Sequence, residues 1–293
     1  MFIATLIAAE RLSSGDISAA EDALEQAGGQ VSGRSWVEPD KACDLLFSSA
    51  PNEARRTLEG VVPGADVIVQ GEAGRRRKLL IADMDSTMIT VECIDELADY
   101  AGFKAEVAEV TERAMGGEIQ FEEALRARVA LLRDLDEDVI DRCRAERVRL
   151  TPGARALVRT MRRDGALTIL VSGGFTRFAE PVGAEIGFER VIANRLLGEN
   201  GRLSGTVAEP IVGAESKRLA LLDALVERGL EREEALAVGD GANDIPMLKE
   251  AGLGVAYRAK PAAAAAADAR IDHSDLTALL YAQGYSRSEW AEA

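Results

Sequence analysis

LLIADMDST, residues 79–87, is the most informative segment of the chain for its architecture. Its first four residues form an uninterrupted apolar run, which is typical of a strand buried on both faces of a parallel sheet. Asp83 and Asp85 follow directly. Carboxylates after a buried strand need a cation, a proton or hydrogen-bond donors nearby, because a buried charge without a partner is costly. A helix cap made by Asp85 or Ser86 is the simpler alternative.

Further apolar runs along the chain resemble this one, and helical windows separate them. The runs are residues 166–172, 235–239 and 253–257, and the helical windows are 152–164, 215–228 and 243–251. This alternation predicts an α/β fold with a Rossmann-like parallel sheet and right-handed crossovers. The connection between the first two strands is unusually long, so residues of about 94–150 are expected to form a helical cap insert. Residues 190–208 are expected to form a hairpin, and a helix is expected from Pro261.

The N-terminal part has a different order of elements. Strands are expected at residues 2–9, 31–37, 44–49 and 65–70, and helices at 16–27 and 51–60. The order βαββαβ predicts a small ferredoxin-like domain. The segment GEAGRRRK at 71–78 is expected to be a solvated linker, because only four basic residues occur there in acidic surroundings. We therefore expect two domains, residues 1–74 and 75–293.

Composition excludes several classes of function. The 293 residues carry 35 basic and 50 acidic side chains, a formal net charge of −15, so nucleic acid is not an expected partner. No apolar run approaches the roughly 18 residues of a membrane span, and no basic residue precedes the first apolar run, as it would in a secretory signal. The cysteines Cys43, Cys93 and Cys143 form no CxxC pair. This pattern fits a reducing compartment, and a cytoplasmic location is expected.

The chain has one histidine, His273, and this limits the chemistry. A Ser-His-Asp triad, a histidine-rich zinc site or a histidine phosphoryl carrier would each have to use that residue. Acid–base chemistry is therefore expected to depend on carboxylates. The sequence also contains neither GxGxxG nor GxxxxGK[ST], so a dinucleotide fold or a P-loop has no support.

The other strand ends carry polar residues, and chemistry in open parallel sheets collects at the carboxyl ends of strands. SGG at 172–174 follows the second core strand, and its amides and hydroxyl suit a phosphate group. GDGAND at 239–244 follows the third and adds two aspartates. Carboxylates from two strand ends on one edge of a sheet form a cluster of hard oxygen ligands, which suits Mg²⁺.

Lys217 stands near the start of a helical window. A lysine at this end of a helix is electrostatically unfavourable, because the helix dipole disfavours cations there. The conflict suggests that Lys217 is held for an anion, and a solvated helix charge is the alternative.

Together DMDST, VSGG, the helix lysine and GDGANDIPML resemble the four motifs of the haloacid dehalogenase (HAD) superfamily of phosphotransferases. The DxD form at 83–85 implies a phosphatase or phosphotransferase. The chain is further similar to the phosphoserine phosphatase family over about residues 79–281, since DMDSTMITVECIDELA, AMGGEIQFEEALRARVALL and TPGA also match. The N-terminal part resembles the ACT-like domain that often precedes the catalytic domain in this family.

The resemblance implies hydrolysis of O-phospho-L-serine to L-serine and phosphate, the last step of serine biosynthesis. It implies that Asp83 attacks phosphorus to form an aspartyl-phosphate, and that Asp85 acts as general acid and then as general base. Ser172, the Gly173 amide and Lys217 would hold the phosphoryl oxygens.

The resemblance also implies the cofactor Mg²⁺ and the residues around the substrate. The metal would be held by Asp83, the main-chain carbonyl of Asp85 and Asp240, with Asp244 acting through the metal's waters. Substrate would be bound by Glu92 at its ammonium group and by Arg128 at its carboxylate, and Asn243 would place substrate or Lys217. Met115 and Phe121 are candidate pocket walls.

Two alternatives stay open at this point. The chain could act on another small phosphomonoester or perform phosphoryl exchange, or it could be an amino-acid sensor with an inert phosphatase core. The N-terminal domain could bind an amino acid, pair two subunits into a homodimer or only pack against the rest.

Overall fold

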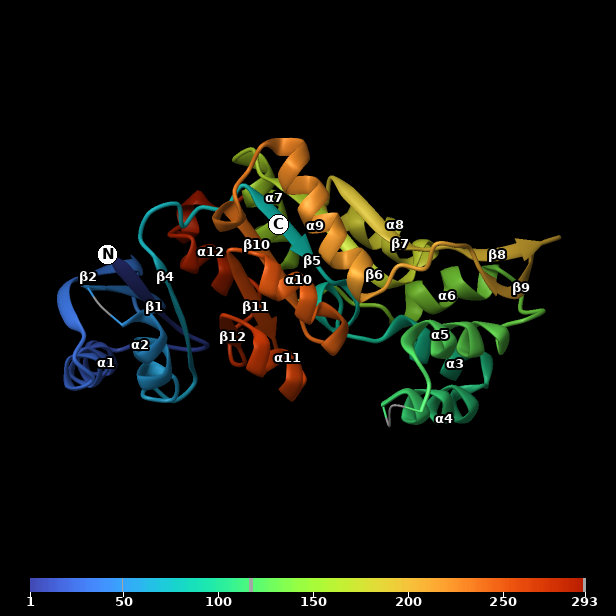
Figure 1. The fold of residues 1–293 in the computed structure, drawn as a ribbon, viewed down its shortest axis with the longest axis horizontal. Coiled ribbons are helices and arrows are strands. Elements are labelled where there is room, and N and C mark those ends of the chain that lie inside the picture. Colours follow the sequence, from blue (N-terminus) through green and yellow to red (C-terminus); the bar gives the residue numbers. More distant parts are fainter. Residues whose placement is uncertain (49, 116–117, 292–293) are drawn as a thin grey trace.

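The computed structural model describes residues 1–48, 50–115 and 118–291, with only the backbone of Ala114 and Met115. Its parts follow one another along the long axis in Figure 1. The N-terminal domain lies at one end, the large sheet and its helices lie in the middle, and the insert helices lie at the other end with a hairpin.

The central sheet has six strands in the order β12-β11-β10-β5-β6-β7, and every neighbouring pair is parallel. The strands are β5 (Leu79–Ala82), β6 (Leu167–Phe175), β7 (Arg190–Asn194), β10 (Ala235–Gly239), β11 (Leu253–Tyr257) and β12 (Ala269–Ile271). The parallel sheet predicted from the apolar runs is confirmed. The short strand β12 was not predicted.

Helices cover both faces of this sheet, as the apolar strands require. In β5, Leu79 and Ile81 pack with the helices on one face, and Leu80 and Ala82 pack with those on the other. The first face carries α9 (Ala214–Arg228) and α10 (Ile245–Glu250), and the second carries α7 (Ala154–Arg163), α8 (Thr176–Ile186) and α12 (Ala278–Ala282). The expected helix at Pro261 is α11 (Pro261–Ala266). Short helical turns are η1 (Met84–Met88), η2 (Arg232–Glu234), η3 (Ala242–Asp244) and η4 (Arg287–Glu289).

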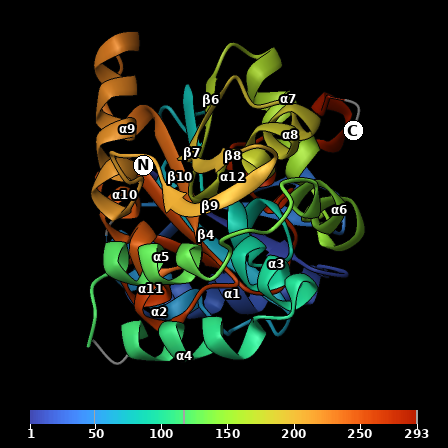
Figure 2. The ribbon, with the colours of Figure 1, turned by 90° about the vertical axis from the view of Figure 1, so that its right-hand side faces the viewer.

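The long connection after β5 is helical, as expected. It contains α3 (Cys93–Ala101), α4 (Lys104–Met115), α5 (Phe121–Ala130) and α6 (Asp138–Arg147). The hairpin of β8 (Leu196–Glu199) and β9 (Arg202–Val207) lies at the same end of the molecule (Figure 2). Backbone hydrogen bonds join the hairpin to the insert, from Asp134 to Leu203 and from Leu203 to Leu135, each 2.9 Å long. The insert and the hairpin therefore form one cover.

The predicted hairpin is confirmed only in part. Its turn lies where expected, since Glu199 pairs with Arg202. Residues 190–194, however, form β7 and pair in parallel with β6. Val191 packs against the core on one face of the sheet and Ile192 against the core on the other, which explains why this segment joins the large sheet.

The N-terminal domain has the predicted ferredoxin-like order. Its elements are β1 (Phe2–Ala8), α1 (Ser14–Gln26), β2 (Gln30–Glu38), β3 (Ala42–Ser48), α2 (Pro51–Leu58) and β4 (Ala65–Gly71). The strands form an antiparallel sheet in the order β2-β3-β1-β4. One face packs under α1 and α2 through residues such as Leu6 and Leu45, while Ile7 and Ile68 on the other face join the core of the large domain.

Polar contacts fix this domain to the rest of the chain. The Asp66 carboxylate accepts hydrogen bonds from the backbone amides of Asp272, His273 and Ser274, at 2.8, 3.1 and 2.8 Å. The segment 71–78 is not a simple solvated linker, because Arg77 is only 7% exposed and donates to Gln70 Oε1 at 2.6 Å. Its guanidinium binds both Gln70 of the N-terminal domain and the carbonyl of Glu233 in the large domain. The composition of the segment could not indicate these contacts.

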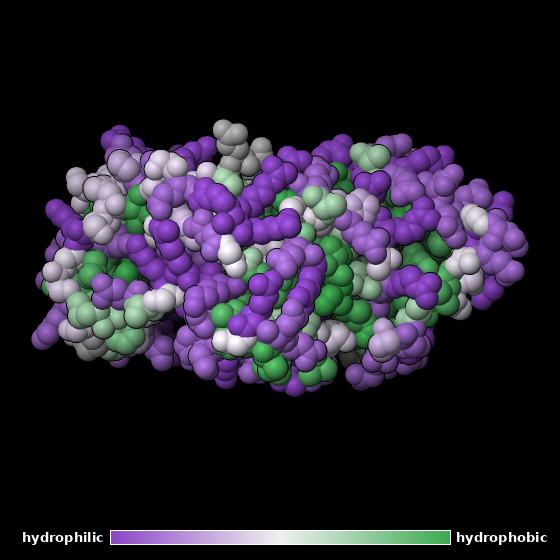
Figure 3. Space-filling model, turned by 90° about the horizontal axis from the view of Figure 1, so that it is seen from above, coloured by the Kyte–Doolittle hydropathy of each residue, from purple (hydrophilic) through white to green (hydrophobic). Residues whose placement is uncertain are grey.

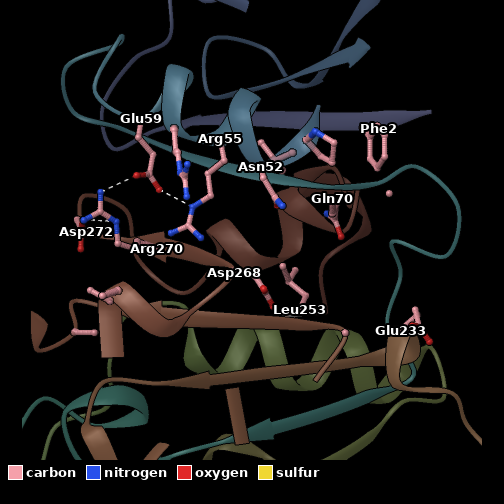
Figure 4. A pocket seen from close by; sticks show the side chains of 18 of the residues that line it. Phe2, Asn52, Arg55, Glu59, Gln70, Glu233, Leu253, Asp268, Arg270 and Asp272 are labelled. Atoms are coloured by element: carbon pink, nitrogen blue, oxygen red, sulfur yellow. Dashed lines mark hydrogen bonds and ion pairs between the residues drawn. The ribbon is translucent and has the colours of Figure 1, made fainter. Parts of the chain in front are cut away.

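A cavity of about 900 Å³ lies between α2 and β4 of the N-terminal domain and the region of α11 and β12 (Figure 4). Among the residues that line the cavity, Glu59 forms an ion pair with Arg55 of the N-terminal domain at 2.8 Å and another with Arg270 of β12 at 3.1 Å. Arg55 also donates to the carbonyl of Ala267 at 2.7 Å. The cavity therefore has walls from both domains and charged groups of both signs.

The face of the molecule shown in Figure 3 is mainly hydrophilic, with hydrophobic side chains in separate patches. Large hydrophobic side chains that are exposed among the described residues are Met1, Trp36, Leu219 and Val226. No helix in the described part of the chain is long and apolar enough to cross a membrane.

Candidate active site

Two neighbouring strands of the large sheet bring the predicted aspartates together. Asp83 directly follows β5 and Asp240 directly follows β10, and these strands pair in parallel. Carboxylate oxygens of Asp83, Asp240 and Asp244 all lie within 4.8 Å of one another, and all three residues are buried. The acidic cluster expected at this edge of the sheet is therefore present.

Lys217 lies inside this cluster. Its Nζ is 2.6 Å from Asp83 Oδ1 and 2.7 Å from Asp244 Oδ1, and its side chain is 0% exposed. The helix α9 begins at Ala214, so Lys217 stands in its first turn, where the helix dipole does not favour a cation. Burial lowers the pKa of Lys217, but the two carboxylates outweigh burial and raise it above the usual value. Lys217 is thus a buried ammonium with two anionic partners.

Both carboxylate oxygens of Asp244 accept hydrogen bonds from other groups of the chain. Oδ1 accepts from Lys217, and Oδ2 accepts from the backbone amides of Asp240 at 3.1 Å and Gly241 at 2.9 Å. A side chain at Gly239 would place its Cβ 2.5 Å from Asp244 Cγ. The glycine before Asp240 is therefore required by the position of Asp244, which explains part of the motif GDGAND.

The Asp83 carboxylate is held at one oxygen. Oδ1 accepts from the backbone amide of Met84 at 2.8 Å and faces Lys217. Burial, and then the neighbouring Asp244, raise the pKa of Asp83, while Lys217 acts in the opposite direction. The second oxygen of Asp83 has no protein donor among the hydrogen bonds of the described residues.

Asp85 turns toward a different group of residues. Its Oδ1 accepts from the Cys93 amide at 3.0 Å at the start of α3, and its Oδ2 accepts from Ser172 Oγ at 3.3 Å. Burial, and then Glu92, raise the pKa of Asp85 to about 6. The helix-cap alternative is not confirmed as stated, because Asp83 and Glu92 are the N-cap residues of η1 and α3. One oxygen of Asp85 accepts from the first amide of α3, and the other lies beside a predicted phosphate-binding hydroxyl.

The segment Ser172–Gly174 was expected to follow the second core strand, but it lies inside β6, where the pairing with β7 is irregular, and it is close to Asp85 and to the insert. Ser172 Oγ accepts from the Gly174 amide at 2.8 Å. A Cβ at Gly174 would lie 2.8 Å from Asp85 Oδ2, and a Cβ at Gly173 would lie 3.2 Å from Phe121 Cζ. Gly174 is therefore needed for the close approach of Asp85, a side chain at Gly173 would be in tight contact with Phe121, and the Phe121 ring of α5 lies against this segment of β6. The side chain of Met115 lies outside the described residues.

Glu92 and Arg128 lie on the insert side of the site. Glu92 stands at the N-cap position of α3 without a capping hydrogen bond from its side chain, and its Oε1 accepts from Ser86 Oγ at 2.7 Å. Arg128 of α5 is half-buried and donates to the Ala124 carbonyl at 3.3 Å. Burial lowers the pKa of Arg128, and the carboxylates of Asp95 and Glu92 oppose this shift, so Glu92 and Arg128 are electrostatic neighbours.

Asn243 is half-buried in η3, next to Asp244. Its Oδ1 would lie 2.4 Å from a Cβ at Gly241, so the side chain lies over that glycine. Among the described residues the hydrogen-bond and ion-pair partners of Lys217 Nζ are Asp83 and Asp244. The role of Asn243 in placing substrate or Lys217 stays a prediction.

Sequence reasoning missed three residues at this edge of the sheet. Thr87 Oγ1 donates to Asp240 Oδ1 at 3.4 Å, and Lys260 Nζ lies 3.7 Å from Asp240 Oδ2. Asn194, which is 2% exposed, donates a hydrogen bond to the carbonyl of Gly173 in β6. Asn194 ends β7 and Lys260 follows β11, so the strand-end rule applied to every strand could have found both.

Comparisons with known proteins agree with this geometry. Residues 80–249, more than half of the chain, match the haloacid dehalogenase-like hydrolase family. A phosphoserine phosphatase from Streptomyces coelicolor is 42% identical over 256 residues, which cover 86% of this chain and 62% of that protein. Phosphoserine phosphatase SerB2 of Mycobacterium tuberculosis is 45% identical over 226 residues, covering 76% of this chain and 55% of that protein. The chain thus spans less than two thirds of the length of these two relatives.

Solved structures extend the similarity to the three-dimensional fold. A crystal structure of a probable phosphoserine phosphatase from Vibrio cholerae has a TM-score of 0.79 and 30% identity, and covers 98% of this chain and 87% of that chain. A structure of a phospho-aspartyl intermediate analogue of phosphoserine phosphatase has a TM-score of 0.65 and 37% identity, covering 70% of this chain and 98% of that chain. From its sequence motifs, its sheet topology and these matches, the chain belongs to the haloacid dehalogenase-like hydrolase family.

Proposed function

We propose that the protein hydrolyses O-phospho-L-serine to L-serine and inorganic phosphate. The observation that carries the proposal is the buried group of Asp83, Asp240 and Asp244 with the Lys217 ammonium between two of them. The choice of substrate rests on the similarity to phosphoserine phosphatases and on the pair Glu92 and Arg128.

In the first step a carboxylate oxygen of Asp83 forms a bond to phosphorus, and the bond from phosphorus to the serine oxygen breaks. Asp85 donates a proton to that leaving oxygen. In the second step Asp85 takes a proton from a water molecule that attacks phosphorus, and phosphate leaves Asp83. A pKa of about 6 supports both roles, because such a group exchanges protons readily near neutral pH.

The phosphoryl oxygens would be held by Ser172, the Gly173 amide and Lys217. Ser172 Oγ lies 3.3 Å from Asp85, so a phosphoryl group bound there would be close to the proton donor. The Lys217 ammonium, held by Asp83 and Asp244, would offset negative charge as it shifts during the transfer. The chain supplies these donors in a buried setting, where they act more strongly than in water.

The donor set fits Mg²⁺. Three buried carboxylates against the buried ammonium of Lys217 and the exposed ammonium of Lys260 leave an excess of negative charge. Carboxylate oxygens are also the ligands that this ion prefers. Asp83, the main-chain carbonyl of Asp85 and Asp240 would hold the ion. Asp244 would act through waters, because both of its oxygens already accept hydrogen bonds from the chain. A bound divalent cation would reduce repulsion between Asp83 and the anionic phosphate.

Substrate selection would depend on the insert. The Arg128 guanidinium presents a planar fork suited to the substrate carboxylate, and the Glu92 carboxylate would bind the substrate ammonium. Phe121 lies over Gly173 and would close the site above the phosphoryl group.

Phosphate release from a panel of small phosphoesters, with Mg²⁺ and with a chelator, tests this proposal. We expect turnover of phosphoserine well above that of glycerol phosphate or an aryl phosphate, and none with the chelator. A stronger preference for another ester would favour the related phosphatase. Phosphate binding without any turnover would favour the amino-acid sensor with an inert core.

We further propose that the domains are residues 1–74 and 75–293, with the cap insert at about 94–150, and that the protein acts in the cytoplasm. The three free cysteines, all buried, agree with a reducing compartment. The cavity of about 900 Å³ between the domains has room for an amino acid, and titration calorimetry with serine and with alanine tests such a ligand. Light scattering of the purified chain tests the homodimer.

A further inference from the structure

Asn194 is the last residue of β7, and its side chain is almost completely buried, with the residue 2% exposed. Its Nδ2 donates to the carbonyls of Gly173, at 2.9 Å, and Val212, at 3.1 Å. Its Oδ1 accepts from the Val212 amide at 2.7 Å. Both ends of the carboxamide are therefore used, and every partner is a backbone group.

These backbone groups belong to two segments that carry proposed phosphate-binding groups. Gly173 is the centre of the segment Ser172–Gly174 in β6. Val212 precedes Gly213, the residue before the first turn of α9, and the Gly213 carbonyl accepts from the Lys217 amide at 3.1 Å. Asn194 therefore joins the segment of β6 that contains Ser172 to the start of the helix that carries Lys217.

The insert contacts the same two segments. A Cβ at Gly173 would lie 3.2 Å from the Phe121 ring, and a Cβ at Gly213 would lie 3.4 Å from it. The ring thus rests on both segments that Asn194 connects. A shift of one segment against the other would change the distance between Ser172 and Lys217 and also the support for Phe121.

We propose that Asn194 is a positioning residue that sets the spacing of the phosphate-binding groups Ser172, Gly173 and Lys217. This inference rests on the proposed phosphatase function. A carboxamide suits this place because it supplies two donor hydrogens and an acceptor in one plane. A carboxylate of the same shape would face two carbonyl oxygens without a hydrogen to donate, and an alanine would leave three backbone groups without partners.

The test compares Asn194→Asp and Asn194→Ala with the matched control Gln283→Ala. Gln283 is 0% exposed, donates to the Leu279 carbonyl and accepts from the Arg77 amide. Its replacement by alanine therefore removes similar buried hydrogen bonds, but outside the phosphate-binding segments. The measurements are kcat and KM for phosphoserine, the inhibition constant of orthophosphate, and the midpoint of thermal unfolding. All kinetics are recorded well below the lowest midpoint.

We expect the Asn194 variants to weaken orthophosphate binding about 10-fold and to lower kcat/KM about 100-fold, because small displacements in a phosphoryl-transfer site are costly. Gln283→Ala should lower the unfolding midpoint and leave both constants within about two-fold of wild type. If Asn194→Ala does not fold, Asn194→Ser, which keeps one hydrogen-bonding group, is used in its place.

Orthophosphate affinity and kcat/KM unchanged in Asn194→Asp would overturn the inference and leave Asn194 a purely structural residue. The failure of the proposed function has a different signature, namely wild-type protein that binds orthophosphate and does not hydrolyse phosphoserine. In that case orthophosphate affinity, measured by calorimetry, still decides whether Asn194 sets the spacing.

Discussion

Lys217 and Asp244 form a hydrogen bond of 2.7 Å between Nζ and Oδ1, and both side chains are 0% exposed. The other oxygen of Asp244 accepts hydrogen bonds from two backbone amides that follow β10. The Lys217 ammonium also lies 2.6 Å from Asp83 Oδ1. The sheet edge, Asp244 and Lys217 thus form a chain of contacts that ends at the proposed nucleophile. The position of Asp83 therefore depends on Lys217 from α9 and, through Lys217, on Asp244.

Replacement of Lys217 by methionine should remove activity and destabilise the protein. The change leaves two carboxylates in a buried site without their cation, a situation that costs about 3–5 kcal/mol when a buried ion pair loses one partner. Urea unfolding gives the free energy of unfolding. The control is Lys249→Met on α10, where the lysine is exposed. Equal stability of the two variants would show that Lys217 does not neutralise the cluster.

Metal removal should abolish turnover reversibly. With a chelator, phosphate release should stop, and added Mg²⁺ should restore it, because the three carboxylates outnumber the ammonium groups of Lys217 and Lys260 and favour a further cation. A saturating ion should also raise the free energy of unfolding, by about 2.7 kcal/mol at a concentration 100 times its Kd. Asp240→Asn should need more Mg²⁺ for half-maximal activity. Full activity of chelated protein would contradict the metal assignment.

Arg128→Ala should impair phosphoserine hydrolysis much more than hydrolysis of an aryl phosphate. The guanidinium is proposed to bind the substrate carboxylate, a group that the aryl ester lacks, and loss of a charged hydrogen bond costs about 1.5–3 kcal/mol, roughly 10- to 150-fold in kcat/KM. The control on the same helix is Arg126→Ala, whose guanidinium pairs with Glu209 at 2.7 Å. Equal losses with both substrates would favour a phosphatase for another ester.

Gly174→Ala should lower activity with little effect on global stability. Its Cβ would lie 2.8 Å from Asp85 Oδ2 and 3.0 Å from Ser172 Oγ, so the proton donor and the phosphate-binding hydroxyl would have to move apart. A displacement of this kind can cost about 100-fold in rate. Steady-state kinetics and thermal unfolding are compared with Gly33→Ala on β2, where a Cβ has no atom within 4 Å. Wild-type kcat in Gly174→Ala would place Asp85 outside the reaction.

The parts of the fold that depend on local pattern could be predicted from the sequence. Continuous apolar runs predict β5, β6, β10 and β11, and the rule that polar residues gather at strand ends predicts that Asp83 lies near Asp240. The strand β7 was misassigned, because RVIAN continues without a break into the hairpin, and only the packing of Val191 and Ile192 on opposite faces separates them.

Long-range contacts account for what the sequence could not indicate. The three hydrogen bonds of Asn194 join residues 18 and 21 positions away, and no local pattern marks an asparagine for that role. Arg77 likewise looked like part of a charged linker, although its environment is made by Gln70 and the backbone at Glu233. Such residues are recognised only when the surrounding segments have been placed.

The most direct measurement is the identification of the residue that carries phosphate during turnover. Protein mixed briefly with radiolabelled phosphoserine and Mg²⁺, quenched in acid and digested, should yield label on the peptide that contains Asp83. Asp83→Asn should show neither label nor turnover, whereas Asp223→Asn, an exposed aspartate on α9, should behave as wild type. Label on a different residue, or phosphoserine hydrolysis by Asp83→Asn at the wild-type rate, would contradict the proposed chemistry.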